Sequence, residues 1–463
     1  MIMNTPQIQD FAGKRIHMIG IGGSSMSGLA QMLQHLGYQV TGSDQNDGYL
    51  MNDVRQAGAK VTIGHRAENV HGADLVVYTA AIPLTNPERA EAERLHIPSM
   101  ERAELLGQLM RHYARAIGIC GAHGKTTTTS MCTHIMMAAE KDPTVMIGGT
   151  LPLLHACHRV GKGNTIIMES CEYYNSFLAL NPTIAVILNI EADHLDFFKD
   201  IEDIKHSFRL FAERVPSETG TVIANCDDAN TMDALRGIER KVITFGLSPK
   251  ADVYAENIVH RGSSSEFDIY HRGNLFSHVT IHVPGIHNVR NALAATAAAI
   301  VLGVSPNAVK YGLAGFEGAG RRFDYKGKFQ GADLYDDYAH HPSELRALLD
   351  AVDTLDYQRT IVVFQPHTYS RTAKLFNDFV EQLRRPTIVY LAEIYAAREK
   401  NTIGISSADL AAQIPGAKFY PTFAEIEAEL RRIARPGDII LTVGAGDVFR
   451  IGEHLLHPAD NKD

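Results

Sequence analysis

The sequence predicts an α/β protein of three domains, each built on a mainly parallel sheet, and three observations support this. The chain has 463 residues, which is too long for one hydrophobic core and suggests about three domains. Short apolar segments alternate with helical segments along the chain, and polar or glycine-rich loops follow them. We expect a Rossmann-like N-terminal domain over residues 1–113, a central domain similar to P-loop ATPases over residues 114–320, and a Rossmann-like C-terminal domain over residues 321–463.

Composition narrows the class of protein before any motif is considered. Hydrophobic residues make up 45% and charged residues 21%, as in ordinary globular proteins, and the net charge of −9 argues against nucleic acid as a partner. The five cysteines are scattered without a Cys-x-x-Cys pair, so we expect neither disulfides nor a zinc site. The N-terminus lacks a signal-peptide core, and the longest apolar run, residues 292–304, is too short to span a bilayer. We therefore expect a cytoplasmic protein with no membrane partner.

The N-terminal domain opens with a strand, a glycine turn and a helix. Arg15–Ile19 is apolar, Gly20–Gly28 follows, and a second strand ends at Ser43-Asp44. This βαβ unit with an acidic residue about twenty positions on favours a diphosphate at the helix N-terminus. The third glycine of a dinucleotide fingerprint would fall at Ser25, so a tight turn needed only for packing remains an alternative.

The central domain contains the most informative stretch of the chain. The apolar segment Ala116–Cys120 runs into Gly121-Ala-His-Gly-Lys-Thr-Thr127, and a helical pattern continues to Ala139. Strand, glycine turn, Lys-Thr and helix together form a phosphate cradle, in which backbone N–H groups, a lysine and a metal-binding hydroxyl meet the anion. The glycine spacing is shorter than in the usual signature, and a plain glycine-rich turn is the alternative.

Two further strands of this domain end in polar groups. Thr165–Met168 is followed by Glu169-Ser-Cys-Glu172, and Thr183–Leu188 is followed by Asn189-Ile-Glu-Ala-Asp-His194. Because parallel strands bring their carboxyl ends to one edge, these groups should lie beside the phosphate loop, and their oxygens suit Mg²⁺. The sequence therefore favours a Mg-ATP site.

The boundary with the third domain carries amides and cations. Asn288 and Asn291 lie three residues apart at the start of a helical segment, so their side chains share one face, and capping explains only one of them. Gly318-Ala-Gly-Arg-Arg-Phe323 is typical of a hinge and carries Arg321 and Arg322. Each strand expected after the hinge is followed by polar residues, for example Asp337–Pro342 and Gln365–Arg371.

Taken together, these motifs resemble the Mur ligase family over essentially the whole chain. The resemblance rests on an ordered set of segments: Gly20-Ile-Gly-Gly with Met26-Ser-Gly28, Gly121–Thr127, Glu169–Glu172 with Ser176-Phe177, Asn189–His194, Gly285–Asn291, Gly320–Phe323, Asp336–Pro342 and Gln365–Arg371. It implies ATP and Mg²⁺ as cofactors and an amide-forming reaction in peptidoglycan precursor synthesis. The branch it is most similar to joins L-alanine to UDP-N-acetylmuramate through an acyl phosphate.

The resemblance also implies roles for individual residues. Catalytic roles fall to Lys125, Glu172, His194 and Arg322, and metal binding to Thr126, Glu172 and His194. ATP would contact Gly121, Ala122, His123, Gly124, Lys125, Thr126, Thr127, Asn288, Asn291, Arg322 and Asp337. The UDP-sugar would contact Gly22, Gly23, Ser24, Ser43, Asp44 and His65, and the amino acid Arg371, Tyr338 and His340.

Some positions depart from the family pattern. Ala122 replaces a common threonine, Thr368 replaces a second arginine expected near the amino-acid carboxylate, and Phe208 stands where ligases for later residues carry a modified lysine. His340, His341 and His367 are candidates for a general base, each equally consistent with a structural role.

Three other functions stay open at this point. They are a ligase that attaches a whole tripeptide to the same nucleotide, an NAD-dependent oxidoreductase suggested by the first glycine loop, and a non-catalytic nucleotide-binding regulator. For the assembly we expect a monomer or a weak homodimer.

Overall fold

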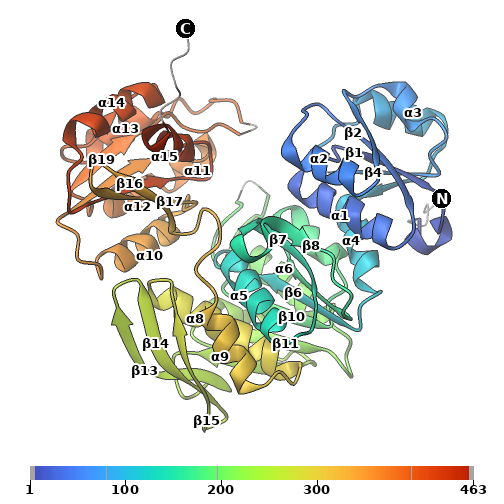
Figure 1. The fold of residues 1–463 in the computed structure, drawn as a ribbon, viewed down its shortest axis with the longest axis horizontal. Coiled ribbons are helices and arrows are strands. Elements are labelled where there is room, and N and C mark those ends of the chain that lie inside the picture. The colour runs from blue at the N-terminus through green and yellow to red at the C-terminus, as the bar shows by residue number, and fades with distance from the viewer. Residues whose placement is uncertain (1–5, 80, 196, 398, 458–463) are drawn as a thin grey trace. The chain divides into compact units, whose positions relative to one another are not determined.

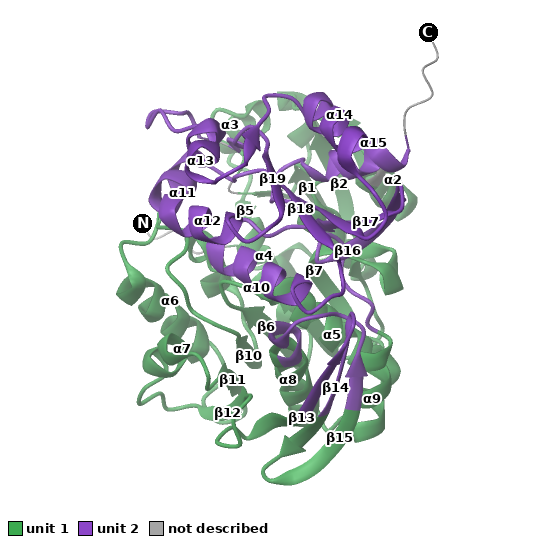
Figure 2. Ribbon diagram, turned by 90° about the vertical axis from the view of Figure 1, so that its left-hand side faces the viewer, with its two compact units in different colours: residues 1–256, 268–278, 290–315 green, residues 257–267, 279–289, 316–463 purple. Residues whose placement is uncertain are grey.

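A computed structural model describes residues 6–79, 81–195, 197–397 and 399–457 (Figure 1). The chain forms two compact units, drawn in different colours in Figure 2. The first unit comprises residues 1–256, 268–278 and 290–315, and the second comprises residues 257–267, 279–289 and 316–463. The unit boundary divides β13, β14, β15 and α8 between the two.

The N-terminal part of the first unit is a five-stranded parallel sheet in the order β3-β2-β1-β4-β5. Apolar side chains such as Ile16 and Met18 of the central strand are fully buried, which accounts for the short apolar runs of the sequence. The elements are η1 Ile8–Phe11, β1 Arg15–Ile19, α1 Ser24–His35, β2 Gln39–Asp44, α2 Tyr49–Gln56, β3 Lys60–Ile63, η2 Ala67–Val70, β4 Leu75–Tyr78, α3 Pro87–Arg94, β5 Ser99–Glu101 and α4 Arg102–Met110.

A ten-stranded sheet follows in the order β15-β14-β13-β12-β11-β10-β6-β9-β7-β8. Strand β6 pairs with β10 on one side and β9 on the other, both in parallel, whereas β7 and β8 are antiparallel. The first elements are β6 Arg115–Cys120, α5 Lys125–Ala138, β7 Thr144–Leu151, η3 Pro152–Leu154, β8 Ala156–Arg159, β9 Thr165–Glu169, η4 Tyr173–Ala179, β10 Ile184–Ile187, α6 Ile201–Glu213, β11 Thr221–Asn225, α7 Ala229–Ala234 and β12 Lys241–Gly246.

The far end of this sheet was not expected from the sequence. It consists of β13 Val253–Arg261, β14 Ser264–His271 and β15 Asn274–Ile281, followed by α8 Ile286–Val301 and α9 Pro306–Ala314. Alternate residues of β14 are buried, among them Phe267 and Ile269, so one face of this strand packs inward.

The second unit contains a six-stranded sheet in the order β16-β17-β21-β18-β19-β20. Among the described residues, β16 and β17 pair antiparallel, whereas the β17–β21, β21–β18, β18–β19 and β19–β20 pairs are parallel. The elements are β16 Asp324–Phe329, β17 Ala332–Asp337, α10 Pro342–Val352, β18 Arg359–Phe364, α11 Tyr369–Lys374, α12 Phe376–Leu383, β19 Ile388–Leu391, α13 Ser407–Gln413, β20 Lys418–Phe419, α14 Phe423–Ile433, β21 Asp438–Val443 and α15 Phe449–Leu456.

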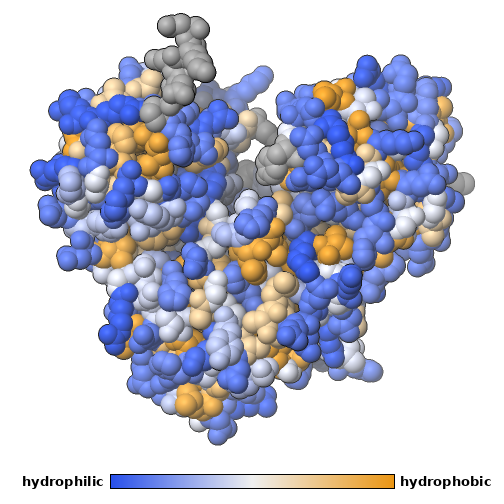
Figure 3. Space-filling model, in the orientation of Figure 1, coloured by the Kyte–Doolittle hydropathy of each residue, from blue (hydrophilic) through white to orange (hydrophobic). Residues whose placement is uncertain are grey.

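The expected fold class is confirmed, since the chain has a three-domain α/β architecture with sheets rich in parallel strands. Apolar side chains lie mainly inside, and hydrophilic residues cover most of the face shown in Figure 3. Among the described residues, no helix combines the length and the apolar character that a membrane crossing needs.

Candidate active site

The phosphate loop lies between β6 and α5 and depends on two glycines. Gly121 has φ 148° and Gly124 has φ 85°, both in the region that side chains disfavour. A Cβ atom at Gly124 would also lie 2.6 Å from Asn291 Oδ1. The loop therefore needs glycine at these positions, and it directs the N-terminus of the 14-residue helix α5 at whatever binds there.

Asn189, which the sequence analysis did not single out as a site residue, holds this loop from the end of β10. Its Oδ1 accepts a hydrogen bond from His123 N at 2.8 Å, and its Nδ2 donates to His123 O at 3.1 Å. The backbone oxygen of Asn189 also accepts from Ala122 N at 3.2 Å. The shape of the phosphate loop is thus set by a neighbouring strand as well as by its own glycines.

Lys125 contacts the carboxylate that follows β9. Its Nζ lies 3.1 Å from both Oε1 and Oε2 of Glu172, and it also donates to the backbone oxygens of Gly121 and Ala122. Burial alone would lower the pKa of Lys125, but the charge of Glu172 outweighs this and raises it. Lys125 therefore stays charged at neutral pH.

His194 completes this cluster from the loop after β10. Its Nε2 lies 3.7 Å from Glu172 Oε1, and its ring stacks on Tyr173 with centroids 4.3 Å apart. The backbone of His194 has φ 53°, an unusual conformation for a non-glycine residue that directs the ring toward Glu172. The strands β9 and β10 flank β6 on opposite sides rather than pairing with each other, which brings all three loops to one edge.

The residues at this edge suit a divalent cation. Glu172 already faces the ammonium of Lys125 with both oxygens, His194 adds an imidazole, and Thr126 supplies a hydroxyl that makes no hydrogen bond among the described residues. Carboxylate and hydroxyl oxygens are preferred ligands of Mg²⁺, which also keeps several waters. The donor set fits the metal that the motifs suggested.

The two asparagines of α8 lie inside the helix rather than at its cap. Asn288 Nδ2 donates to Pro284 O at 2.6 Å, which ties the first turn of α8 to the preceding loop. Asn291 Oδ1 accepts from Thr128 Oγ1 of α5 at 3.3 Å. Asn291 is therefore in contact with the helix that follows the phosphate loop.

The glycine loop of the N-terminal domain is held by the end of β2. Gly20 N and Ile21 N both donate to Ser43 O, at 2.8 and 3.0 Å, and Gly22 N donates to Asp44 Oδ2 at 3.0 Å. Gly23 is the N-cap of α1, and Ser24 is its first residue. Gly22, Gly23, Ser24, Ser43 and Asp44 are thus brought together around one helix N-terminus.

Ser25 stands in place of the third glycine and has a partner of its own. Its Oγ accepts a hydrogen bond from Arg102 Nη1 at 2.8 Å. Arg102 is the first residue of α4, so this contact places a guanidinium within the first turn of α1. The departure from the fingerprint thus adds a cation where a glycine would leave none.

Sequence reasoning missed a buried carboxylate beneath this loop. Glu88 of α3 is 0% exposed, accepts from Ser43 Oγ at 2.6 Å and lies 3.3 Å from His65 Nδ1. Burial would raise the pKa of Glu88, but its contacts with His17, Ser43 and Asn69 lower it to about 2. No local signal marks Glu88, because an acidic residue in the first turn after Asn86-Pro87 is typical of any helix.

In the second unit the two hinge arginines have different surroundings. Arg321 donates to Asp336 Oδ2 at 2.9 Å and to the backbone oxygens of Gly444 and Gly446 at 2.6 and 3.1 Å. It therefore ties the hinge to the ends of β17 and β21. Arg322 instead lies over the Tyr338 ring, 4.6 Å from its centroid, and its one hydrogen bond to another described residue is donated to Arg321 O.

Asp337 also holds backbone in place at the end of β17. Its Oδ2 accepts from Phe323 N at 2.7 Å, and its Oδ1 accepts from Ala339 N at 2.8 Å. Burial raises the pKa of Asp337 to about 6, although the charge of Arg322 opposes the rise. Its carboxylate thus joins the hinge to the Asp-Tyr-Ala-His loop.

The residues expected to bind the amino acid lie together in the second unit. The His340 ring lies 5.4 Å from the Tyr338 ring and 5.6 Å from the His367 ring, and Arg371 Nη1 lies 3.0 Å from His367 Nδ1. Thr368, beside them, has φ 62°, a strained value for a β-branched residue.

The three candidate bases have distinct contacts. His341 caps α10, and its Nδ1 lies 2.7 Å from Ser343 Oγ, which is a structural role. His340 Nδ1 lies 3.2 Å from Glu344, and His367 stacks on Tyr395.

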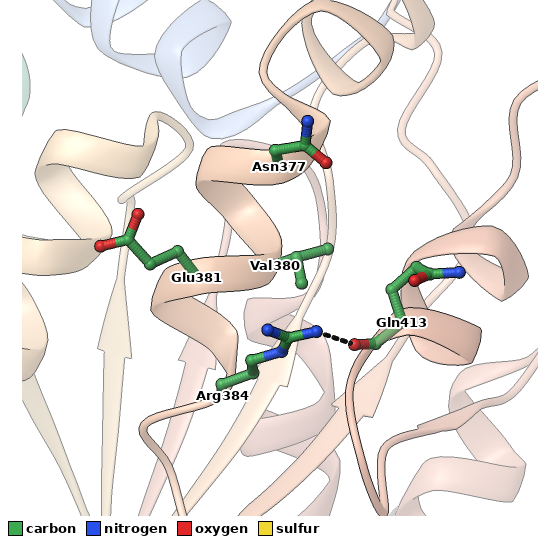
Figure 4. Close-up of a pocket in the computed structure, with 5 residues that line it drawn as sticks. All are labelled: Asn377, Val380, Glu381, Arg384 and Gln413. Atoms are coloured by element: carbon green, nitrogen blue, oxygen red, sulfur yellow. Dashed lines mark hydrogen bonds between the residues drawn. The ribbon is translucent and has the colours of Figure 1, made fainter.

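A shallow pocket of about 350 Å³ lies elsewhere on the second unit, between α12 and α13 (Figure 4). Arg384 Nη2 crosses it to donate to Gln413 O at 2.9 Å. None of the residues that line this pocket is a predicted residue of the active site.

Fold and site together define a protein with a P-loop-like central domain and a second glycine loop at a helix N-terminus. Three family models match it in order: "Mur ligase family, catalytic domain" over residues 15–114, "Mur ligase middle domain" over residues 119–299, and "Mur ligase, glutamate ligase domain" over residues 321–446. The chain belongs to the Mur ligase family.

Similar proteins and a solved structure support this family membership. A UDP-N-acetylmuramate–L-alanine ligase of Agathobacter rectalis is 47% identical over 447 residues, which cover 95% of this chain and 97% of the relative. A similar enzyme of Clostridium novyi is 45% identical, with 96% and 97% covered. The crystal structure of UDP-N-acetylmuramate-alanine ligase from Thermotoga maritima superposes with a TM-score of 0.80 at 26% identity, covering 96% of this chain and 99% of that one.

Proposed function

We propose that this chain joins L-alanine to the lactyl carboxylate of UDP-N-acetylmuramate, with cleavage of ATP to ADP and phosphate, in peptidoglycan precursor synthesis. The observation that carries this proposal is the cluster of Lys125, Glu172 and His194 around the β6–α5 loop. The proposal is also supported by the 47% identity of this chain, over nearly its full length, to a UDP-N-acetylmuramate–L-alanine ligase.

The need for ATP follows from the chemistry of the carboxylate. A carboxylate is a poor acyl donor because its leaving group would be oxide. One carboxylate oxygen therefore attacks the γ-phosphorus of ATP, and ADP leaves, which gives an acyl phosphate. The neutral amine of L-alanine attacks the acyl carbon, phosphate leaves with that oxygen, and the amine loses a proton. Positioning and charge neutralisation are then the main tasks of the protein.

We assign the phosphoryl-transfer roles to the edge formed by β9, β6 and β10. The loop Gly121, Ala122, His123 and Gly124, with Thr127, cradles the phosphates, and Lys125 neutralises their charge. Thr126, Glu172 and His194 would hold Mg²⁺, which when bound adds positive charge beside the transferred phosphoryl group. This assignment is supported by the contacts of Lys125 and His194 with Glu172.

The N-terminal glycine loop is assigned to the UDP-sugar. Gly22, Gly23 and Ser24 at the start of α1 would bind the diphosphate, while Ser43, Asp44 and His65 lie at the ends of β2 and β3. The hydrogen bonds that join Gly20, Gly22, Ser43 and Asp44 support a preformed site.

Residues of α8 and the second unit complete the assignment. Asn288, Asn291, Arg322 and Asp337 would contact ATP, and Arg371, Tyr338 and His340 would contact the amino acid. The proposed domain boundaries remain 1–113, 114–320 and 321–463. We also propose a monomer or a weak homodimer, which sedimentation equilibrium over a hundredfold range of protein concentration would test.

Phosphate release with ATP, Mg²⁺ and UDP-N-acetylmuramate tests the proposed function when L-alanine, glycine, L-serine and the L-alanyl tripeptide are compared. We expect release with L-alanine and a product heavier by one alanyl residue. Release only with the tripeptide would favour the recycling ligase.

The other two functions make different predictions. A nucleotide-binding regulator would release phosphate with none of the four acceptors. An NAD-dependent oxidoreductase leaves the Lys125–Glu172–His194 cluster without a role.

A further inference from the structure

We propose that Glu88 is a positioning residue that fixes the tautomer of His65, so that His65 Nε2 accepts a hydrogen bond from the N3–H group of uracil. The inference rests on the proposed binding of a UDP-sugar to the N-terminal domain and adds to it the device that selects the base. Glu88 lies outside every motif on which the resemblance is based.

Glu88 contacts residues of β1, β2 and the loop that follows β3. It belongs to α3, whose N-cap Asn86 accepts from Glu88 N at 2.9 Å. Its side chain contacts His17 of β1 at 3.6 Å, Ser43 at the end of β2, and His65 in the loop that follows β3. Glu88 is fully buried, and burying a carboxylate costs free energy unless its oxygens accept hydrogen bonds.

Burial would raise the pKa of Glu88, but its hydrogen bonds with His17, Ser43 and Asn69 lower it to about 2, so its carboxyl group is ionised. Oε1 accepts from Asn69 Nδ2 and, at 3.4 Å, from Arg66 N, while Oε2 accepts from Ser43 Oγ at 2.6 Å. An ionised carboxylate only accepts hydrogen bonds, so the single hydroxyl hydrogen of Ser43 points to Glu88.

The position of the proton on His65 follows from this. Its Nδ1 lies 3.0 Å from Ser43 Oγ and 3.3 Å from Glu88 Oε2. Ser43 Oγ has no hydrogen left to donate and Glu88 can only accept, so Nδ1 must carry the proton. In the neutral ring Nε2 is then an acceptor.

The Nε2 atom is available for a ligand. It makes no hydrogen bond among the described residues, and it is not one of their buried unsatisfied atoms. The His65 side chain is only 8% exposed, so the ring has little freedom to turn. Nε2 is therefore a hydrogen-bond acceptor held in a fixed orientation at the edge of the sheet.

The strand order indicates that His65 Nε2 would face the uracil base of the nucleotide. Strands β1, β2 and β3 are consecutive neighbours, and adjacent strands lie about 4.8 Å apart. The diphosphate belongs at the α1 N-terminus after β1, and the ribose belongs beside Asp44 at the end of β2. The next step along the edge is His65, where the base would lie.

Uracil and cytosine differ at the atom that would face His65. N3 of uracil carries a hydrogen and can donate, whereas N3 of cytosine is an acceptor. An acceptor at Nε2 therefore favours uracil and leaves two lone pairs opposed with cytosine, which costs affinity.

The substitution Glu88→Gln should reverse this preference without changing shape. Asn69 and Arg66 require an acceptor, so the Gln oxygen would replace Oε1 and its NH₂ would replace Oε2. The NH₂ then donates to Ser43, Ser43 donates to His65 Nδ1, and the His65 proton moves to Nε2.

The test is the binding of UDP and CDP to the full-length enzyme, measured by titration calorimetry. We expect native enzyme to bind UDP at least ten times more tightly than CDP, and Glu88→Gln to lower this ratio at least tenfold. The KM for ATP should not change. Glu91 lies on the same helix, and its side-chain partners among the described residues are His71 and Arg94, so Glu91→Gln is the matched control and should keep the native ratio.

A second measurement needs no variant of Glu88. Nitrogen-15 NMR of labelled histidine at pH 8.5 distinguishes the two neutral tautomers, and His65→Gln identifies the His65 signal. We expect protonated Nδ1 and unprotonated Nε2 in native enzyme. Protonated Nε2, or an unchanged ratio in folded Glu88→Gln, would overturn the proposal.

These outcomes are separable from failure of the proposed function. If the chain did not use UDP-N-acetylmuramate, native enzyme would neither bind UDP nor turn over. If only the role of Glu88 is wrong, native enzyme turns over and prefers UDP while Glu88→Gln behaves in the same way.

Discussion

Lys125 contacts both the phosphate loop and Glu172, one of the proposed metal ligands. Its Nζ contacts both oxygens of Glu172 and two backbone oxygens of its own loop. If the γ-phosphate binds here as proposed, the charge of Lys125 stabilises the negative charge on the phosphoryl group throughout its transfer to the carboxylate.

Replacing Lys125 should therefore abolish turnover but not UDP-sugar binding. We expect Lys125→Ala to lower kcat by about a thousandfold or more, because a preorganised charge on the transferred group is lost. The thermal stabilisation by UDP-N-acetylmuramate should persist, since we assign that ligand to the other glycine loop. Lys205→Ala, which removes ion pairs with Glu202 and Asp233 and none of the contacts of Lys125, serves as the control. Retained turnover in Lys125→Ala would refute the assigned role.

Asp337 makes the stability of the protein depend on pH. Its pKa is raised to about 6 in the folded protein, against about 4 in an unfolded chain, so folding favours the protonated form. This contribution is fully present below pH 4 and is lost as pH rises through 6.

Relative to Asp337→Asn, native protein should lose about 2 kcal/mol of unfolding free energy between pH 4.5 and pH 7.5. Urea denaturation at the two pH values measures this difference. Asp333→Asn on the same strand is the control. An equal difference between native protein and Asp337→Asn at both pH values would contradict the raised pKa.

Two important residues were not predictable from the sequence. Glu88 contacts Ser43, 45 positions earlier, and Asn189 contacts His123, 66 positions earlier. Neither residue differs locally from an ordinary helix-start acid or a loop amide. Their roles come from burial and from strand order, which arise only when the chain folds.

At the scale of elements, the unit β6–loop–α5 is what the sequence predicts best. Its apolar strand, two glycines and Lys-Thr are local signals, and the expected strand Ala116–Cys120 and helix to Ala139 agree with Arg115–Cys120 and Lys125–Ala138. The flanking strands β9 and β10 were also expected, because each is a short apolar run that ends in polar residues.

The prediction was incomplete for β13, β14 and β15. Burial alternates along much of β14 and β15, whereas β13 is buried at its start and mostly exposed beyond it, and none of the three carries a residue of the proposed chemistry. The strands predicted from the sequence are those with candidate site residues at their ends, and β13, β14 and β15 lack this signal.

The contact between β10 and the phosphate loop leads to a prediction at this scale. Asn189→Ala removes two hydrogen bonds to His123, so the loop should lose its preformed shape. We expect the KM for ATP to rise by about tenfold or more, while affinity for UDP-N-acetylmuramate stays the same.

The matched control is Asn230→Ala. It removes one hydrogen bond to Ile190 O, next to Asn189 in the chain, without touching the loop. If both variants raised the KM for ATP equally, the effect would come from general loosening and not from the loop.

At the scale of the whole molecule, the first unit contains the two glycine loops that we propose bind nucleotides, and the second contains the residues that we propose bind the amino acid. A three-domain α/β fold was predictable because alternation of strands and helices is a property of the whole sequence. The conformations of Arg321 and Thr368, both with positive φ, were not, since they depend on the loops that surround them.

Transfer of oxygen from the lactyl carboxylate to phosphate reports both the ligase reaction and its acyl phosphate intermediate. UDP-N-acetylmuramate labelled with ¹⁸O in its lactyl carboxylate is incubated with ATP, Mg²⁺ and L-alanine, and the released phosphate is analysed by mass spectrometry. The account predicts one ¹⁸O atom in each phosphate and one alanyl residue in each product. Unlabelled phosphate, or phosphate released without an alanyl product, would contradict it.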